Sequence, residues 1–191
     1  MRFAKGFSIT GITGVVLLIT AFFNNIIVTR QLGPDGRGKY IIITYLVMFI
    51  VLVFGEGIRR SSTILIGRYR TIENRLFYQS LFYTFLVTLV LLLLYYLIPL
   101  WDNLFPNLSD QLFILSIFVS VFTLLWQTFQ AIFLGLEKIY HYNIIQLLFI
   151  ISVFILNFTG IYFFDYQLED IITNQLIAAV ISFLFGFYFI N

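Results

Sequence analysis

Six long apolar runs dominate the sequence and limit the folds open to it. They occupy residues 7–28, 40–67, 76–100, 111–136, 144–164 and 171–190. A helix of about 20 apolar residues crosses the hydrocarbon core of a bilayer, and each run is long enough to do so. Only 10% of the residues are charged, against about 25% in soluble domains. We therefore predict an all-α integral membrane protein with six transmembrane helices.

Cysteine, histidine and acidic residues are too few for several kinds of chemistry. The chain has no Cys and a single His, His141, which we predict to lie in a loop, so a metal cluster and disulfides are excluded. The only dense acidic group, at residues 165–170, has no basic or histidine companion for acid–base catalysis. No basic tract with interleaved aromatic residues is present. We predict neither an enzyme, nor a metal site, nor a nucleic-acid partner.

Three ionisable residues interrupt the second apolar run. Glu56, Arg59 and Arg60 stand at i, i+3 and i+4, so a helix places them on one face. A charged side chain in hydrocarbon costs about 2.5–3.5 kcal/mol on insertion scales and normally faces protein or a wet cavity. One interpretation is that this face lines a cavity. The other is that the span ends near Gly57 and the arginines anchor it at the cytoplasmic surface.

The segment between the first two runs carries a strong turn signal. Gly33, Pro34, Asp35 and Gly36 follow one another there, and we predict a loop over residues 30–40. Its glycines and proline fit turn geometry better than chemistry. The basic residues of this loop either lie in solvent or hold lipid phosphate; they are Arg30, Arg37 and Lys39.

The distribution of basic residues predicts the orientation of the chain. With the amino terminus in the cytoplasm, the outer loops hold only the three basic residues of the first loop. The inner segments hold the other eight, namely Arg2, Lys5, Arg59, Arg60, Arg68, Arg70, Arg75 and Lys138. Basic residues favour the cytoplasmic side. We therefore expect both termini inside and acidic loops outside, at residues 102–110 and 165–170.

Uncharged polar residues inside the spans form a second set of candidates. They are Asn24, Asn25, Gln127, Gln130 and Asn157. In a transporter cavity such side chains hydrogen-bond sugars. In a helical bundle they more often join neighbouring helices through hydrogen bonds. The sequence leaves both interpretations open.

Several short motifs resemble those of one transporter family. The first loop reads Arg30-x-Leu32-Gly33-Pro34-x-x-x-Gly38-x-Tyr40, the second run contains Gly55-x-Gly57, and Gly135-Leu136-Glu137 follows the fourth. In these features the chain resembles bacterial polysaccharide flippases of the Wzx type, which export O-antigen and other lipid-linked oligosaccharides. They belong to the MATE-like (MOP) superfamily of exporters. The resemblance extends over nearly the whole chain.

The resemblance implies a fold, a substrate and a location. Residues 1–191 would form the amino-terminal six-helix lobe of a two-lobe transporter whose carboxyl-terminal lobe is missing here. The substrate would be a lipid-linked glycan of the undecaprenyl diphosphate type, moved across the bacterial cytoplasmic membrane by alternating access. No cofactor is implied, and coupling to Na⁺ or H⁺ stays open. Arg59 and Arg60, with Glu56 beside them, match the family's cavity arginines, whereas the first span has only Asn24 and Asn25.

Two other functions compete with this one. A MATE-like, cation-coupled multidrug antiporter has the same architecture, but it needs an acidic residue in its cavity to bind cations. A structural multi-span subunit needs no charge inside the second span, and its charged face would pack dry against other helices. The surroundings of Glu56, Arg59 and Arg60 therefore distinguish the three functions.

Overall fold

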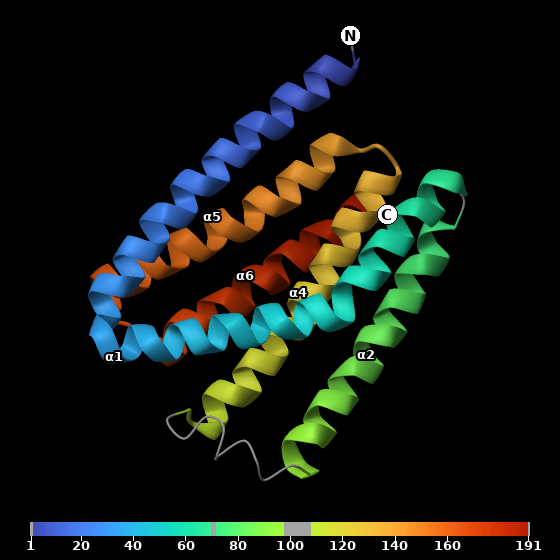
Figure 1. Ribbon diagram of the computed structural model, residues 1–191. Helices are drawn as coiled ribbons and strands as arrows, with labels where there is room; N and C mark the ends of the chain where they lie inside the picture. Colours follow the sequence, from blue (N-terminus) through green and yellow to red (C-terminus); the bar gives the residue numbers. More distant parts are fainter. Residues whose placement is uncertain (1, 70–71, 98–107, 191) are drawn as a thin grey trace.

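The computed structural model describes residues 2–69, 72–97 and 108–190, and its elements there are all helices. Figure 1 shows how they are arranged. The helices are α1 (Arg2–Arg68), α2 (Glu73–Leu97), α4 (Asp110–Gly135), α5 (Ile139–Phe164) and α6 (Leu168–Ile190). In this part of the chain five helices are long and apolar enough to cross a membrane. An all-α, multi-pass membrane protein is therefore confirmed.

The predicted number of six separate helices is wrong, because the first two apolar runs belong to one bent helix. α1 is helical at every residue except Gly33, whose φ of 65° and ψ of −173° break it into two limbs, residues 2–32 and 34–68. This conformation is open almost only to glycine. Pro34 then starts the second limb, where its missing N–H costs nothing. The loop predicted over residues 30–40 thus shrinks to one residue, and α1 doubles back (Figure 1).

Two other connections are also shorter than predicted. α5 begins at Ile139, so the expected loop over residues 137–143 is reduced, and His141 lies in a helix with its ring stacked on Phe133 at 5.5 Å. α6 begins at Leu168 instead of residue 171. Left-handed residues at Glu137 (φ 59°) and Asp165 (φ 54°) turn the chain quickly at both places.

Some predicted features lie outside the described residues. They are Arg70, the end of the third span at residues 98–100, and most of the first acidic loop, residues 101–107. The described end of that loop caps α4, because the Ser109 hydroxyl accepts a hydrogen bond from the backbone N–H of Leu112 at 3.4 Å. The predicted start of the fourth span at residue 111 is close to the observed start at Asp110.

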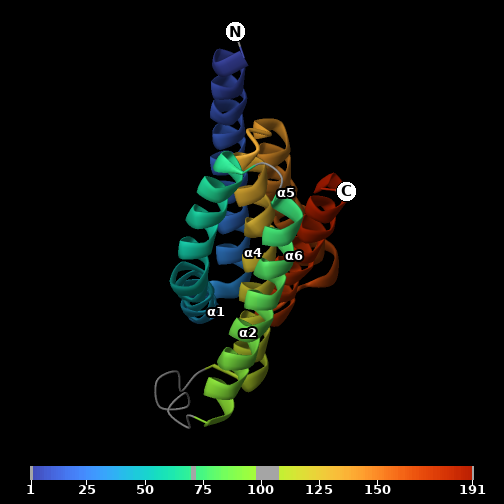
Figure 2. The same ribbon diagram turned by 90° about the vertical axis from the view of Figure 1, so that its right-hand side faces the viewer.

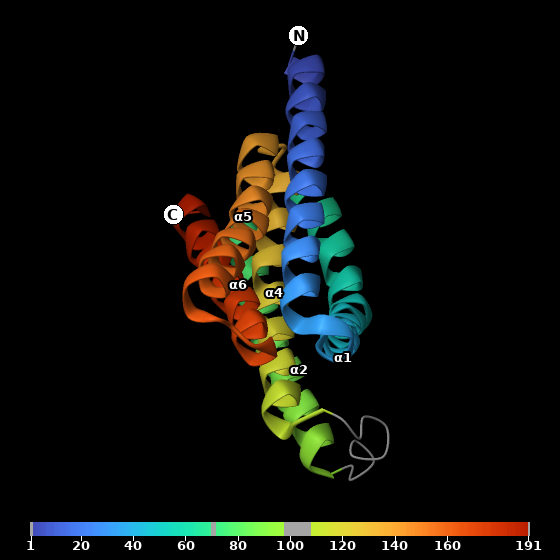
Figure 3. The ribbon, with the colours of Figure 1, turned by 90° about the vertical axis from the view of Figure 1, so that its left-hand side faces the viewer.

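α4 is the central helix of the bundle. It packs against each of the other four helices, which surround it in Figures 2 and 3. Every helix contributes to the main hydrophobic core, with Ile66 from α1, Phe77 from α2, Phe129 from α4, Ile145 from α5 and Ala179 from α6 among its residues. The other helices turn wide apolar faces outward, as membrane-embedded helices do. α4 therefore fixes where the other helices place their polar residues.

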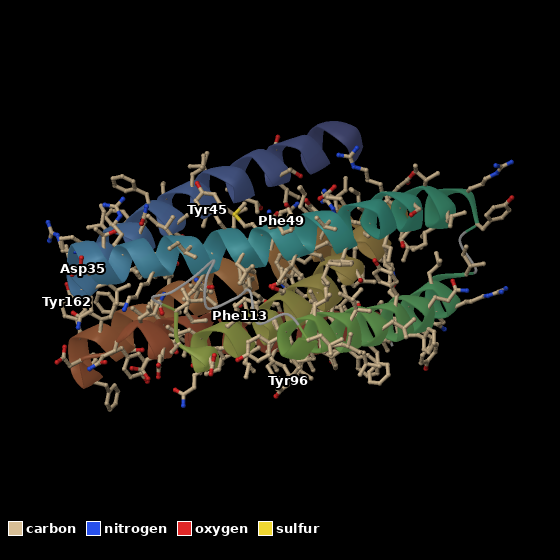
Figure 4. All side chains as sticks on the ribbon, turned by 60° about the horizontal axis from the view of Figure 1, so that its bottom comes forward. Asp35, Tyr45, Phe49, Tyr96, Phe113 and Tyr162 are labelled. Atoms are coloured by element: carbon tan, nitrogen blue, oxygen red, sulfur yellow. The ribbon has the colours of Figure 1, made fainter. Side chains whose placement is uncertain are left out.

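Successive helical segments run in opposite directions between two ends of the molecule. The amino terminus, the end of α1, the α4–α5 connection and the carboxyl terminus lie toward one end (Figures 1 and 3). The bend at Gly33 and the α5–α6 connection lie at the other end. Gln31 ties these two together by donating from Nε2 to Asp165 Oδ1 at 2.8 Å. Figure 4 accordingly shows Asp35 and Tyr162 close to one end.

Candidate functional site

The charged residues of the second run form one cluster. Arg59 Nη2 donates to Glu56 Oε1 at 2.6 Å, and Arg60 Nε donates to Glu56 Oε2 at 3.2 Å. The predicted common face is therefore confirmed. Two guanidinium groups share a single carboxylate, so the cluster carries one net positive charge. The helix continues without a break to Arg68, well beyond Gly57.

The three side chains of this cluster are not fully buried against other helices. The side chains of Arg59, Arg60 and Glu56 are 37%, 79% and 31% exposed. The two arginines line a pocket of about 290 Å³, which we call the arginine pocket. Its walls come from α1, α4 and α5, and they are Arg59, Arg60, Thr63, Ile64, Gln130, Ala131, Leu134 and Tyr142. No acidic side chain is among them.

Two donors in the arginine pocket have no hydrogen-bond partner among the described residues. They are Arg59 Nε and Gln130 Nε2, both buried. Buried polar atoms are rarely left without a hydrogen-bond partner. An unpartnered buried atom therefore needs an explanation, such as a missing ligand. Because both atoms are donors, the pocket lacks acceptors. An anion with several oxygens would supply them.

The arginine pocket is held in place by a close approach of α1 and α4. Thr63 Oγ1 donates to the carbonyl of Ala131 in α4 at 3.2 Å. A Cβ at Gly135 would lie 2.8 Å from the Thr63 carbonyl oxygen, and one at Gly55 would lie 2.6 Å from Leu124. Gly135 thus lets the two backbones meet and Gly55 makes room for the Leu124 side chain, whereas Gly57 has open space around its Cβ position.

A larger pocket lies between the two limbs of α1, nearer the bend. We call it the apex pocket, and its volume is about 630 Å³, within the range of small-molecule sites. Ala21 and Asn24 of the first limb and Tyr45 and Met48 of the second are among the residues that line it. The polar lining residues are Asn24, Asn25, Tyr40, Thr44, Tyr45, Thr123, Trp126, Gln127 and Gln175. No charged residue lines this pocket.

Asn157 does not reach either pocket. Its Nδ2 donates to Asn24 Oδ1 at 3.0 Å, and its Oδ1 accepts from Asn174 Nδ2 at 2.9 Å. All three amides are buried, and together they link α1, α5 and α6. We call this the asparagine relay. Of the two interpretations for Asn157, the structure favours helix joining.

The other amide candidates are divided between the two pockets. Asn25 and Gln127 line the apex pocket, and Asn24 reaches it from the relay. Gln130 lines the arginine pocket, although it is only three residues from Gln127. The structure therefore separates residues that the sequence placed in one group.

The loop-motif residues have different roles. Gly33 forms the break and Pro34 starts the second limb. Tyr40 lines the apex pocket, where its hydroxyl accepts a hydrogen bond from Gln175 Nε2 at 2.9 Å. Arg30 is exposed, and Gly38 has open space around it. Of this motif, only Tyr40 reaches a pocket that we describe.

Sequence reasoning missed Trp126, Gln175 and Tyr142 as lining residues. Trp126 could have been recognised from the sequence, because tryptophan prefers the ends of membrane spans and this one lies well inside α4. Nothing in the sequence was a reason to select Gln175 or Tyr142, because each lies near a helix end, where polar residues are common. Only the packing of α5 and α6 against α4 reveals them.

No cluster of three potential metal ligands is present in the described parts of the chain. Comparison with family models, curated proteins and solved structures finds no match to this chain. The chemistry of the two pockets is therefore the main guide to function.

Proposed function

We propose that this chain is a lobe of a transporter that flips a lipid-linked oligosaccharide across the bacterial cytoplasmic membrane by alternating access. The observation that carries the proposal is the exposed pair of arginines on the wall of a pocket, with one carboxylate between them. The family-like motifs in the first loop and the second run supply the identity of the substrate, a glycan on an undecaprenyl diphosphate.

The arginine pocket suits a diphosphate for electrostatic and geometric reasons. Guanidinium groups bind phosphate oxygens through two parallel N–H donors. The unpartnered donors Arg59 Nε and Gln130 Nε2 extend this set. Glu56 holds both arginines in the empty site, and an arriving diphosphate takes over part of their hydrogen bonding. Arg59 and Arg60 then bind the head group, and Glu56 positions them.

The same observations favour an anion transporter over its rivals. A structural subunit would bury the charged face, but Arg60 is 79% exposed. A cation antiporter needs negative charge in the pocket, and the cluster carries the opposite sign. The two limbs of α1 count as two crossings, which with the other four helices make the six of a flippase lobe. We place the end with the arginines in the cytoplasm and expect a second lobe to face the two pockets.

The test is glycan export in cells whose surface polysaccharide depends on this gene. Arg60→Ala should abolish surface glycan while the protein stays folded and membrane-inserted. The matched control is Arg75→Ala, an exposed basic residue at the same end of the molecule that lines neither pocket. Normal export by a well-expressed Arg60→Ala variant would contradict the proposal.

A further inference from the structure

The apex pocket combines many hydrogen-bonding groups with a complete lack of charge. Its lining includes four side-chain amides, two threonines and two tyrosines, but no Asp, Glu, Lys, Arg or His. Burying a charge without a partner is costly, so a charged ligand group is disfavoured here. A purely apolar ligand is disfavoured too, because it would cover the polar groups without pairing them.

An unpartnered donor at this pocket points to a ligand. Trp126 is 6% exposed and lines the apex pocket, and its Nε1–H has no partner among the described residues. Buried tryptophan N–H groups usually find an acceptor. A hydroxyl or amide oxygen of a ligand would supply it. The stacked pair Trp126 and Phe149, with ring centroids 4.9 Å apart, adds aromatic surface to the same wall.

The apex pocket and the arginine pocket lie along the same three helices. α1, α4 and α5 contribute to both, with Met48 and Arg59 as the nearest lining residues on α1. Arg59 is eleven positions beyond Met48, which corresponds to about 16 Å along the helix axis. A ligand with an anionic end and a neutral body can therefore occupy both pockets at once.

We propose that the apex pocket binds uncharged sugar units and discriminates against acidic ones. In this assignment Tyr40, Gln127 and Gln175 hydrogen-bond sugar hydroxyls, and the Trp126 N–H donates to a sugar oxygen. The identification of these sugars as part of a lipid-linked glycan rests on the proposed function. The preference for a neutral, hydroxyl-rich ligand rests on the pocket alone. The transported glycan repeat would then carry no uronic or sialic acid in the units next to the diphosphate.

Trp126 itself can report on binding. The chain has two tryptophans, and Trp101→Phe leaves Trp126 as the only one. The purified full chain with this substitution, in lipid nanodiscs, is titrated with neutral chitotetraose and maltotetraose and with acidic tetragalacturonate. We expect a saturable change in Trp126 emission with at least one neutral tetrasaccharide and none with tetragalacturonate.

Variants separate this proposal from a general effect on the protein. Tyr40→Phe and Gln175→Leu should each raise the apparent Kd about fivefold, the factor expected for one lost hydrogen bond. Thr159→Val, at a half-buried position of α5 outside both pockets, is the control and should leave binding unchanged. Equal responses to neutral and acidic sugars, or no response to either neutral sugar, would overturn the proposal.

The outcome is also distinguishable from failure of the proposed function. Arg60→Ala should leave the Trp126 response to neutral sugars intact, because Arg60 does not line the apex pocket. If neutral sugars bind but export does not depend on Arg60, the sugar site stands and the flippase function fails. If export depends on Arg60 but neutral sugars do not bind, the flippase function stands and the sugar site is wrong.

Discussion

The side-chain amide of Asn157 donates a hydrogen bond to Asn24 across 133 positions of sequence, at 3.0 Å. Asn157 also accepts a hydrogen bond from Asn174 in α6. The first limb of α1 is therefore fastened to α5 and α6 by polar contacts inside an otherwise apolar bundle. This fastening sets the position of one wall of the apex pocket, because Asn24 also lines it.

Loss of the central amide should destabilise the bundle. Asn157→Ala removes one donor and one acceptor and leaves two buried amides unpaired, which costs about 1–3 kcal/mol. Thermal or denaturant unfolding in detergent measures the change. Asn25→Ala, an exposed neighbour of the relay, should have little effect on stability. Equal stability of the two variants would show that the relay is not structural.

The close approach of α1 and α4 should not tolerate a methyl group. In Gly135→Ala the new Cβ would lie 2.8 Å from a backbone oxygen of α1, so the helices must separate, at a cost of about 1–3 kcal/mol. Gly57→Ala meets no atom within 4 Å and should be neutral or slightly stabilising. Unfolding measurements on both variants check this contrast, and a tolerated Gly135→Ala would contradict it.

The bend in α1 should depend on Gly33. Its φ of 65° and ψ of −173° are almost inaccessible to alanine, so Gly33→Ala strains the bend by about 1–3 kcal/mol and should change the angle between the limbs. Because the chain has no Cys, spin labels at Ala21→Cys and Met48→Cys report the distance across the apex pocket. Gly38→Ala is the control. An unchanged distance distribution in Gly33→Ala would refute the prediction.

The carboxylate of Glu56 should compete with a bound diphosphate. Glu56→Gln weakens its hold on both arginines and leaves them freer to bind an anion. We expect inorganic pyrophosphate to bind this variant severalfold more tightly, as measured by calorimetry at low ionic strength. Arg60→Lys keeps the charge but loses the fork of donors, so binding should weaken. Weaker pyrophosphate binding by Glu56→Gln would contradict this prediction. It would show that Glu56 helps binding by positioning the arginines and does not compete with the anion.

Much of the helical content could be predicted from the sequence. An apolar run of 20 or more residues in a membrane forms a helix, because a helix satisfies the backbone hydrogen bonds within the run itself. The starts of α2 and α4 and the ends of α4, α5 and α6 lie within about three residues of the prediction, the usual uncertainty of helix boundaries predicted from sequence. The common face of Glu56, Arg59 and Arg60 also followed, since three and four residues nearly complete one helical turn.

Connections and polar contacts were harder to predict. The turn signal at residues 33–36 was correctly located, but one left-handed glycine reverses the chain where we predicted a loop of eleven residues. Asn157 and Gln127 look alike in the sequence, yet one joins helices and the other lines a pocket. The difference depends on which helix packs against each face, and that is a long-range property.

The sequence alone determined that this chain is a bundle of apolar helices and that one helix face carries three charges, because both follow from local composition and from the helical period. Only the tertiary structure decided that this face borders a pocket with unpartnered donors, that a neutral pocket lies beside it, and that the asparagines fasten the helices. Those features depend on how α1 folds back at Gly33 and on which residues α4 brings against it.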